Sequence, residues 1–221
     1  MNIWYILCIA AIIVSVFASV SVKATFGKYN GIRTRGGRSA AEIAREILDD
    51  NGLYHVKIVE CPGDLSDHYD PRNQTVALSQ TVHNNDTIGA VSVAAHEVGH
   101  AIQHARNYAP VKIRTAIFPL VSICSRFWYV VLLAGILLEM FQLVQAAIIL
   151  FSVAVFFQFI TLPVEFDASN RAMATIADKG YLNGDEIAGA RKTLSAAAFT
   201  YIAALLVSLT QLLRLLASAR R

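Results

Sequence analysis

The chain has 221 residues, of which 55% are hydrophobic and 16% are charged. In soluble domains about a quarter of the residues are charged, so the low charged fraction disfavours a soluble cytosolic protein. The high hydrophobic fraction excludes an intrinsically disordered chain. The formal net charge is only +3, and no Lys/Arg-rich tract is interleaved with aromatic residues, which argues against nucleic acid as a partner. Three cysteines, two of them inside apolar runs, cannot form a disulfide framework. The sequence therefore excludes a small extracellular domain held together by disulfide bonds and is compatible with a protein in a reducing compartment.

Apolar stretches of membrane-spanning length occur in three places. Residues 1–22 contain an uncharged run from Ile3 to Val22, close to the ~20 residues that cross a bilayer core. A cleaved signal peptide is the alternative, but no positive segment precedes the run and it is long for such a peptide. Residues 116–162 are too long for one span, so we expect a helical hairpin folded at residues 139–142. Residues 196–221 hold a fourth span and the C-terminus.

Two arginines lie within these spans. Arg126 falls in the second span, where an isolated charge at mid-membrane costs ~2.5–3.5 kcal/mol. We therefore expect its side chain to face the protein interior or a polar cavity. Arg214 lies near the end of the fourth span, from which a long side chain reaches the interface.

Four spans place residues 23–115 and residues 163–195 on one side of the membrane. The basic residues beside the spans gather in these two segments: Lys23, Lys28, Arg33, Arg35, Arg38, Lys112, Arg114, Arg191 and Lys192. Only the terminal Arg220 and Arg221 oppose them. The positive-inside rule then makes both polar segments cytoplasmic in a multi-pass protein of the cell membrane.

Segment 23–115 shows the pattern of a small α+β unit. Ser39-Ala40-Ala41-Glu42 is a capping box, which predicts a short amphipathic helix that stops at Asn51-Gly52. Tyr54 to Glu60 and Gln74 to Leu78 are extended candidates separated by turn residues. A unit of fewer than about a hundred residues has a thin core, so we expect it to lean on the membrane helices or on a metal.

A third predicted element of this segment carries chemistry. With Asn85-Asp86 as N-cap, Thr87 to Arg106 is predicted to be a helix that contains His96-Glu97-Val98-Gly99-His100. Two histidines four residues apart share one helix face and can bind a single ion, with the glutamate beside them to hold a metal-bound water. Zinc suits this pattern because two histidines leave room for a third ligand and an open water position.

A solvated helix face with two histidines and a glutamate is the alternative interpretation. The neighbours of the motif are small and apolar, so its polar groups are partly buried and need a partner. A third ligand should lie on the same side of the membrane, where Leu162-Pro163-Val164-Glu165 begins the second polar segment. Pro163 suits the first position of a helix, which would place Glu165 in the first turn, close to the membrane surface.

Three strings together resemble a known family: HEVGHAIQH at 96–104, LPVEFDAS at 162–169 after a transmembrane hairpin, and DHYDP at 67–71. They look like those of the YugP-type neutral zinc metallopeptidases of bacteria, over essentially the whole chain. More distantly, the chain is similar to the HtpX and CAAX-prenyl-protease group, gluzincins whose second motif is E-x-x-x-D. The resemblance implies a zincin-like domain with His96, His100 and Glu165 as zinc ligands and Glu97 as general base. Ser169 stands where that group has its Asp, so the usual carboxylate that orients a ligand histidine is missing there, and Asp167 is a substitute to test.

Other polar residues near the motifs are weaker candidates. His68 and Tyr69 precede the strand that leads to the metal helix, and either can donate a hydrogen bond to a developing oxyanion, although packing or turn roles are the commoner outcome. His104 continues the face of His96 and His100 and is either a supporting group or a surface residue. Arg171 is expected to form an ion pair on a helix surface.

The predicted fold class is a mainly α integral membrane protein, with four transmembrane helices and a small α+β zincin-like metallopeptidase domain. The predicted function is hydrolysis of peptide bonds by a zinc-activated water at the cytoplasmic membrane face. Peptides or proteins, membrane proteins included, are the expected substrates, and the bilayer is the surrounding partner; the sequence specifies neither a cleavage site nor an oligomeric state. The alternatives are a non-catalytic membrane protein with a structural zinc site, which the open ligand position disfavours, and a small transporter, which the lack of broken helices disfavours.

Overall fold

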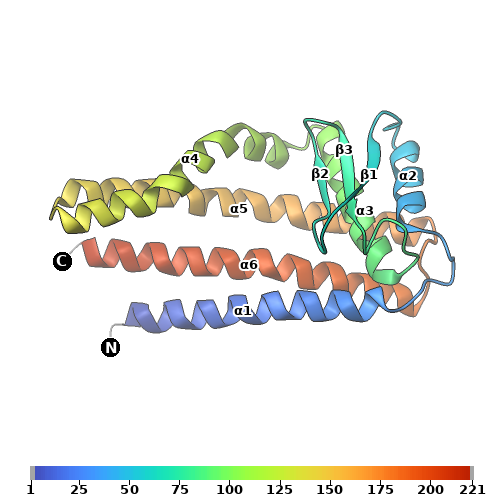
Figure 1. The fold of residues 1–221 in the computed structure, drawn as a ribbon, viewed down its shortest axis with the longest axis horizontal. Helices are drawn as coiled ribbons and strands as arrows, with labels where there is room; N and C mark the ends of the chain where they lie inside the picture. Colours follow the sequence, from blue (N-terminus) through green and yellow to red (C-terminus); the bar gives the residue numbers. More distant parts are fainter. Residues whose placement is uncertain (1–2, 220–221) are drawn as a thin grey trace. The chain divides into compact units, whose positions relative to one another are not determined.

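The computed structural model describes residues 3–219. In that range the chain forms six helices and a three-stranded sheet (Figure 1), in the order α1 (Ile3–Asn30), α2 (Ala40–Asp50), β1 (Lys57–Cys61), β2 (His68–Asp70), β3 (Thr75–Ser79), α3 (Ile88–Ala105), α4 (Ala109–Leu137), α5 (Phe141–Asp178) and α6 (Asp185–Ala219). Helices α1, α4, α5 and α6 are long and apolar enough to cross a membrane. This confirms the predicted fold class, a mainly α membrane protein with a small α+β part.

The chain divides into two compact units. The membrane unit comprises, among the described residues, 3–19, 112–163 and 199–219; the polar unit comprises residues 20–111 and 164–198. The four long helices each contribute residues to both units.

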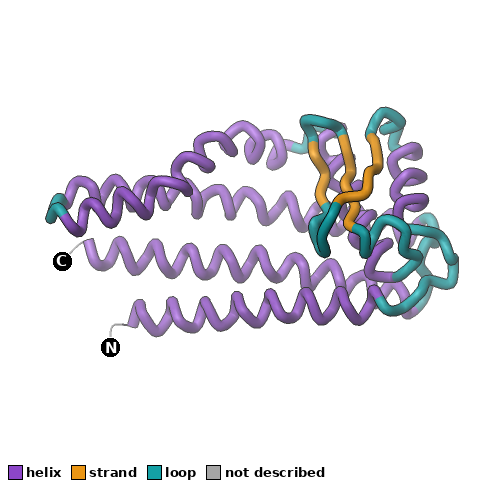
Figure 2. The backbone as a smooth tube through the Cα atoms, viewed as in Figure 1, coloured by secondary structure: helices purple, strands orange, loops and turns teal. Residues whose placement is uncertain are grey.

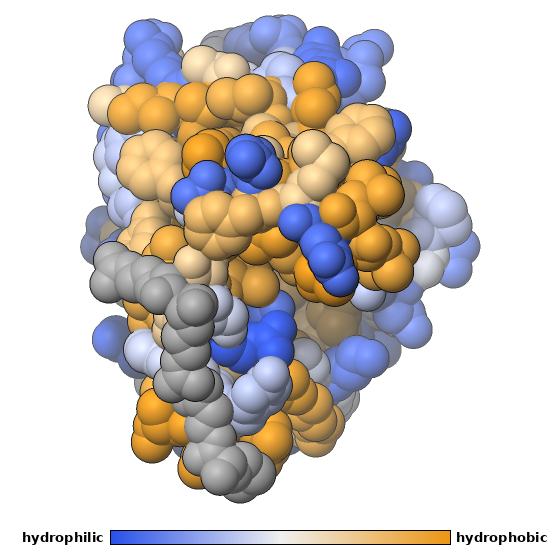
Figure 3. Space-filling model, turned by 90° about the vertical axis from the view of Figure 1, so that its left-hand side faces the viewer, coloured by the Kyte–Doolittle hydropathy of each residue, from blue (hydrophilic) through white to orange (hydrophobic). Residues whose placement is uncertain are grey.

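Within the membrane unit, α4 and α5 form the predicted hairpin with almost no loop. Glu139 adopts φ 53° in the turn, the left-handed conformation that ends a helix abruptly. Gly135 is needed for the close approach of the two arms, because a Cβ there would lie 2.9 Å from the backbone nitrogen of Val144. Trp128 of α4 packs on Phe151 of α5, with ring centroids 4.4 Å apart. Figure 3 shows the end of the molecule that carries the turn, where apolar side chains predominate.

Polar side chains join the helices of this unit. Gln158 of α5 donates to Ser208 of α6 at 2.9 Å. Closer to the free end of α6, the guanidinium of Arg214 lies over the ring of Tyr5 of α1, 5.2 Å from its centroid. These contacts place α6 between α1 and α5.

The expectation that Arg126 faces the protein interior was wrong. Its side chain is exposed on α4 instead of facing the interior of the membrane unit. The helix face that packs on α5 is occupied by aromatic side chains such as Trp128, so the arginine lies on another face.

In the polar unit, the capping box predicted for α2 is present. Ser39 accepts from the backbone of Glu42, and the Glu42 carboxylate accepts from the backbone of Ser39. The buried face of α2 carries Ile43, Ile47 and Leu48.

The sheet of the polar unit has the order β1-β3-β2 (Figure 2). β1 pairs with β3 in parallel, and β2 pairs with β3 antiparallel, with Tyr69 opposite Val76. β1 and β3 lie close to the predicted extended segments, whereas β2 was not predicted as a strand because three residues are too few to show alternation. Asp67 fixes the start of β2, because its carboxylate accepts from the backbone and hydroxyl of Ser79 at 2.7 and 3.0 Å. Burial raises the pKa of this carboxyl group despite those hydrogen bonds.

The core of the polar unit extends beyond its own small elements, as the thin sheet led us to expect. Its buried residues come from α2, the sheet and α3, and also from the polar-unit ends of three long helices: Phe26 of α1, Ala172 and Ile176 of α5, and Ala190 and Leu194 of α6. These ends supply the apolar surface that a three-stranded sheet lacks.

The N-cap of α3 is Thr87, not Asn85-Asp86 as predicted. Thr87 has extended backbone angles, and its hydroxyl accepts from the backbone of Ala90. The carbonyls of Asn85 and Asp86 instead accept from the backbones of Ala40 and Thr34, which holds both residues in the loop before the helix.

The position of Pro163 also differs from the prediction. Pro163 lies inside α5, which continues without a break from Phe141 to Asp178, so Glu165 is a mid-helix residue rather than part of a first turn. A proline removes one helical hydrogen bond, but ending the helix would leave several backbone groups without partners in apolar surroundings, which costs more.

Candidate metal centre

Helix α3 presents the two histidines of the HExxH motif side by side. The ring centroids of His96 and His100 are 4.7 Å apart, and the rings meet edge to face. Their side chains are 14% and 15% exposed, so one edge of the pair remains accessible. Between them in the sequence, Glu97 is buried at 9% exposure.

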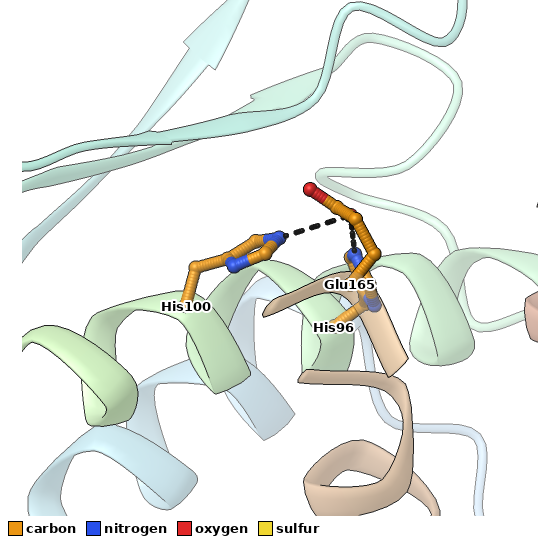
Figure 4. Close-up of side chains that lie close together, drawn as sticks. All are labelled: His96, His100 and Glu165. Carbon is orange, nitrogen blue, oxygen red and sulfur yellow. Dashed lines mark ion pairs between the residues drawn. The ribbon is translucent and has the colours of Figure 1, made fainter. Parts of the chain in front are cut away.

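Helix α5 brings a carboxylate to the same point. Glu165 Oε2 lies 3.4 Å from His96 Nε2 and 3.5 Å from His100 Nε2 (Figure 4). The three side chains offer one ligand atom each, and these atoms lie within 4.8 Å of one another. The structure thus brings together the three residues predicted as metal ligands.

The spacing of the three atoms fits a tetrahedral ion. A charge-assisted hydrogen bond between nitrogen and oxygen would be ~2.7–2.9 Å long, shorter than either separation here. Two ligands at ~2.0–2.1 Å from a tetrahedral zinc ion lie ~3.3 Å apart, close to the observed 3.4 and 3.5 Å. Two imidazole nitrogens and one carboxylate are also the donor set of catalytic zinc sites, which leave a fourth position open.

The local charge favours a cation. Burial alone would lower the pKa of His100, but the ion pair with Glu165 and the negative charge of Glu97 outweigh burial and raise it. The buried carboxylates of Glu97 and Glu165 therefore concentrate negative charge beside His100, and a divalent ion would neutralise this charge.

A glutamine that sequence analysis missed orients His100. Gln103 is completely buried, and its amide nitrogen donates to the carbonyl of Val164 at 2.7 Å and to Asp167 at 2.8 Å. Its amide oxygen therefore faces His100 Nδ1, 3.0 Å away, and can only accept. Nδ1 must carry the proton, which leaves the lone pair of His100 on Nε2, the atom that faces Glu165.

Ser169 orients the ring of His96, as Gln103 orients that of His100. Its hydroxyl lies 3.1 Å from His96 Nδ1, so a serine contacts the histidine at the position where the resemblance leads one to expect an aspartate. Asp167 acts only indirectly, through Gln103, and is held by Arg171 at 2.6 Å, the ion pair expected on this helix. The one sequence signal for Gln103 was its place in an apolar stretch, three residues after His100.

Backbone contact between α3 and α5 sets the separation of the two motifs. A Cβ on Gly99 would lie 2.8 Å from the carbonyl oxygen of Ala168, so only glycine allows this crossing. Gly99 lies between His96 and His100 on α3, and Ala168 lies between Glu165 and Ser169 on α5. The two helices therefore cross at the centre of the cluster.

The edge strand β2 distinguishes between the two oxyanion candidates. Tyr69 is partly buried, and its ring lies 5.7 Å from that of His104, one turn beyond His100 on α3. His68 is exposed, with Nδ1 2.8 Å from the carbonyl of Ser66, because successive strand residues point to opposite faces. Burial, together with the charge of Asp70, raises the pKa of Tyr69, so its hydroxyl keeps a proton to donate.

Residues 4–220 match the family described as "Putative neutral zinc metallopeptidase". The chain belongs to this family. It is 50% identical over 208 residues to "Putative membrane protease YugP" of Bacillus subtilis (strain 168), an alignment that covers 94% of this chain and 92% of the relative. No solved structure matches the chain.

Gly99→Ala tests the helix crossing. The added methyl group must push α5 away from α3, so we expect zinc affinity to fall ~10-fold or more and stability to fall by ~1–3 kcal/mol, the usual cost of overpacking. Chelator competition and thermal unfolding measure the two effects. Gly27→Ala in α1 is the control, since nothing lies within 4 Å of its Cβ position. Unchanged zinc affinity in Gly99→Ala would show that the crossing tolerates a methyl group.

Gln103→Leu tests the orientation of His100. Loss of the amide frees the ring to rotate and leaves Val164 and Asp167 without their donor, so we expect zinc affinity to fall ~10- to 100-fold. The control is Gln80→Leu on an exposed turn. Wild-type zinc affinity in a folded Gln103→Leu protein would contradict the assigned role.

Proposed function

We propose that this protein is a zinc-dependent peptidase that hydrolyses peptide bonds at the cytoplasmic face of the membrane. The observation that carries the proposal is the convergence of His96, His100 and Glu165, with buried Glu97 beside them. Membership of a zinc metallopeptidase family supports the same chemistry.

The proposed roles follow from the position of each side chain. His96, His100 and Glu165 hold the ion, and an ion bound there supplies Lewis acidity that lowers the pKa of water toward ~7. Glu97 accepts a proton from the attacking water as the new C–O bond forms. It then gives the proton to the amide nitrogen as the C–N bond breaks, so no covalent acyl-enzyme is needed.

The sheet offers a place for an extended substrate. β2 pairs with β3 along one edge, and among the described strands nothing pairs with its other edge. A peptide added to this edge gains backbone hydrogen bonds and runs beside α3. Tyr69 projects from β2 toward α3, where its hydroxyl is our candidate donor to the substrate carbonyl oxygen as negative charge develops.

The cytoplasmic location rests on the charge asymmetry of the chain. The basic residues beside the apolar stretches of the long helices lie mainly within residues 23–115 and 163–195, which include the polar ends of these helices. The positive-inside rule then assigns both segments, and with them the metal centre, to the cytoplasm.

Glu97→Gln separates catalysis from metal binding. The amide cannot accept a proton, so we expect hydrolysis of labelled casein to fall ~100-fold or more while zinc content is unchanged. A non-catalytic protein with structural zinc would show no hydrolysis in either form, and a transporter would need no zinc at all. Full turnover by Glu97→Gln would rule out the glutamate as the general base.

Glu165→Ala tests the third ligand. We expect loss of hydrolysis and at least a ~10-fold weaker hold on zinc, because a ligand should matter at least as much as the residues that orient ligands. Glu165→Asp should be nearly as damaging, since the shorter carboxylate draws back from the ion, and Asp167→Ala should be milder. Glu139→Gln in the hairpin turn is the matched control. If Asp167→Ala lost zinc while Glu165→Ala kept it, Asp167 would be the ligand.

Cysteine labelling tests the orientation. In a background without the three natural cysteines, Asn73→Cys should resist a membrane-impermeant maleimide in intact cells and react after permeabilisation. Glu139→Cys in the opposite turn should react in intact cells. The reverse pattern would place the metal centre outside the cell.

A further inference from the structure

A charge lies near the middle of the apolar part of α4. Arg126 is midway between Arg114 and Glu139, the charged residues that bound this stretch. At 1.5 Å per residue it is ~18 Å along the helix from either, which places it near the middle of a ~30 Å hydrocarbon core. Neither interface is within easy reach of its side chain.

Arg126 belongs to a polar stripe on one face of α4. Ser122, Arg126 and Tyr129 follow one another at intervals of four and three residues, so they share a helix face, and Ser125 flanks them. All four side chains are exposed, Tyr129 by 60%. Lipid-facing surfaces are normally apolar, whereas small hydroxyl residues and charges are typical of contacts between membrane helices.

Nothing in the membrane unit neutralises this charge. Within residues 3–19, 112–163 and 199–219, Glu139 is the one acidic residue, and it lies in the hairpin turn at the edge of the apolar region. Arg126 forms no ion pair or hydrogen bond with any described residue. Arg214 differs, because the Tyr5 ring covers its guanidinium.

We propose that this face of α4 binds a transmembrane helix of another protein that carries Asp or Glu near its middle. A carboxylate at the depth of Arg126 forms a charge-assisted hydrogen bond that the low dielectric strengthens. Ser122 and Ser125 are small enough to let the partner backbone approach, and their hydroxyl groups add polar contacts.

A second copy of this chain does not meet the requirement. A two-fold axis that pairs α4 with α4 brings Arg126 opposite Arg126 at the same depth, and like charges repel strongly there. The chain has no acidic residue at mid-span to offer in exchange. The partner is therefore a different protein.

Model helices test the proposal directly. The full-length protein, labelled with a fluorescence donor, is reconstituted in phosphatidylcholine vesicles with acceptor-labelled Leu/Ala helices of 22 residues whose central residue is Asp, Leu or Lys. We expect the Asp-centred helix to associate ~10-fold more strongly than the Leu-centred helix. Equal association of these two helices would overturn the proposal.

Charge variants identify the residue responsible. Arg126→Leu should abolish the preference for Asp and remain folded, since it removes an exposed charge from the membrane. Arg126→Glu should reverse the preference, so that the Lys-centred helix associates best. Arg214→Leu is the matched control and should behave as wild type. Persistence of the preference in Arg126→Leu would refute the assignment.

Lipid headgroups are the competing anions. Adding phosphatidylglycerol to the vesicles should leave the preference for the Asp-centred helix in place. Its disappearance would assign Arg126 to lipid phosphates and overturn the proposal.

Discussion

The geometry of the candidate metal centre depends on the backbone contact between α3 and α5. Gly99 lies against the carbonyl of Ala168, and a methyl group at Gly99 would come within 2.8 Å of that oxygen. Because the crossing lies one position from His100 on α3 and three from Glu165 on α5, the helix spacing sets the separation of the ligand atoms. A cluster whose members must converge within a few tenths of an ångström needs such a rigid reference.

Burial gives the cluster its chemical character. Glu97 and Glu165 are both buried, and the negative charge they share raises the pKa of His100. In most proteins such a pair would be a cost. Here Gln103 and Ser169 contact the Nδ1 atoms of His100 and His96, so the Nε2 lone pairs and the Glu165 carboxylate face one point, where a divalent cation would satisfy all of them.

The core of the small polar unit includes residues from three of the long helices. The sheet, α2 and α3 supply most of the buried residues, and Phe26, Ile176 and Leu194 from α1, α5 and α6 complete the core. The same helices continue into the membrane unit, so α5 both spans the apolar region and carries Glu165. The continuity of α5 through Pro163 therefore places Glu165 on the same helix that is long and apolar enough to cross a membrane.

The sequence by itself determined the features that arise from local pattern. Apolar runs of bilayer length predicted the four membrane helices, the capping box predicted α2, and the HExxH spacing put His96 and His100 on one face, because each depends on residues near one another in the chain. Only the tertiary structure decided the rest: the three-residue strand β2, the hydrogen bond from Gln103 to Asp167 on another helix, the continuity of α5 through Pro163, and the exposure of Arg126. These depend on which elements pack together, and no local spacing in the sequence encodes that choice.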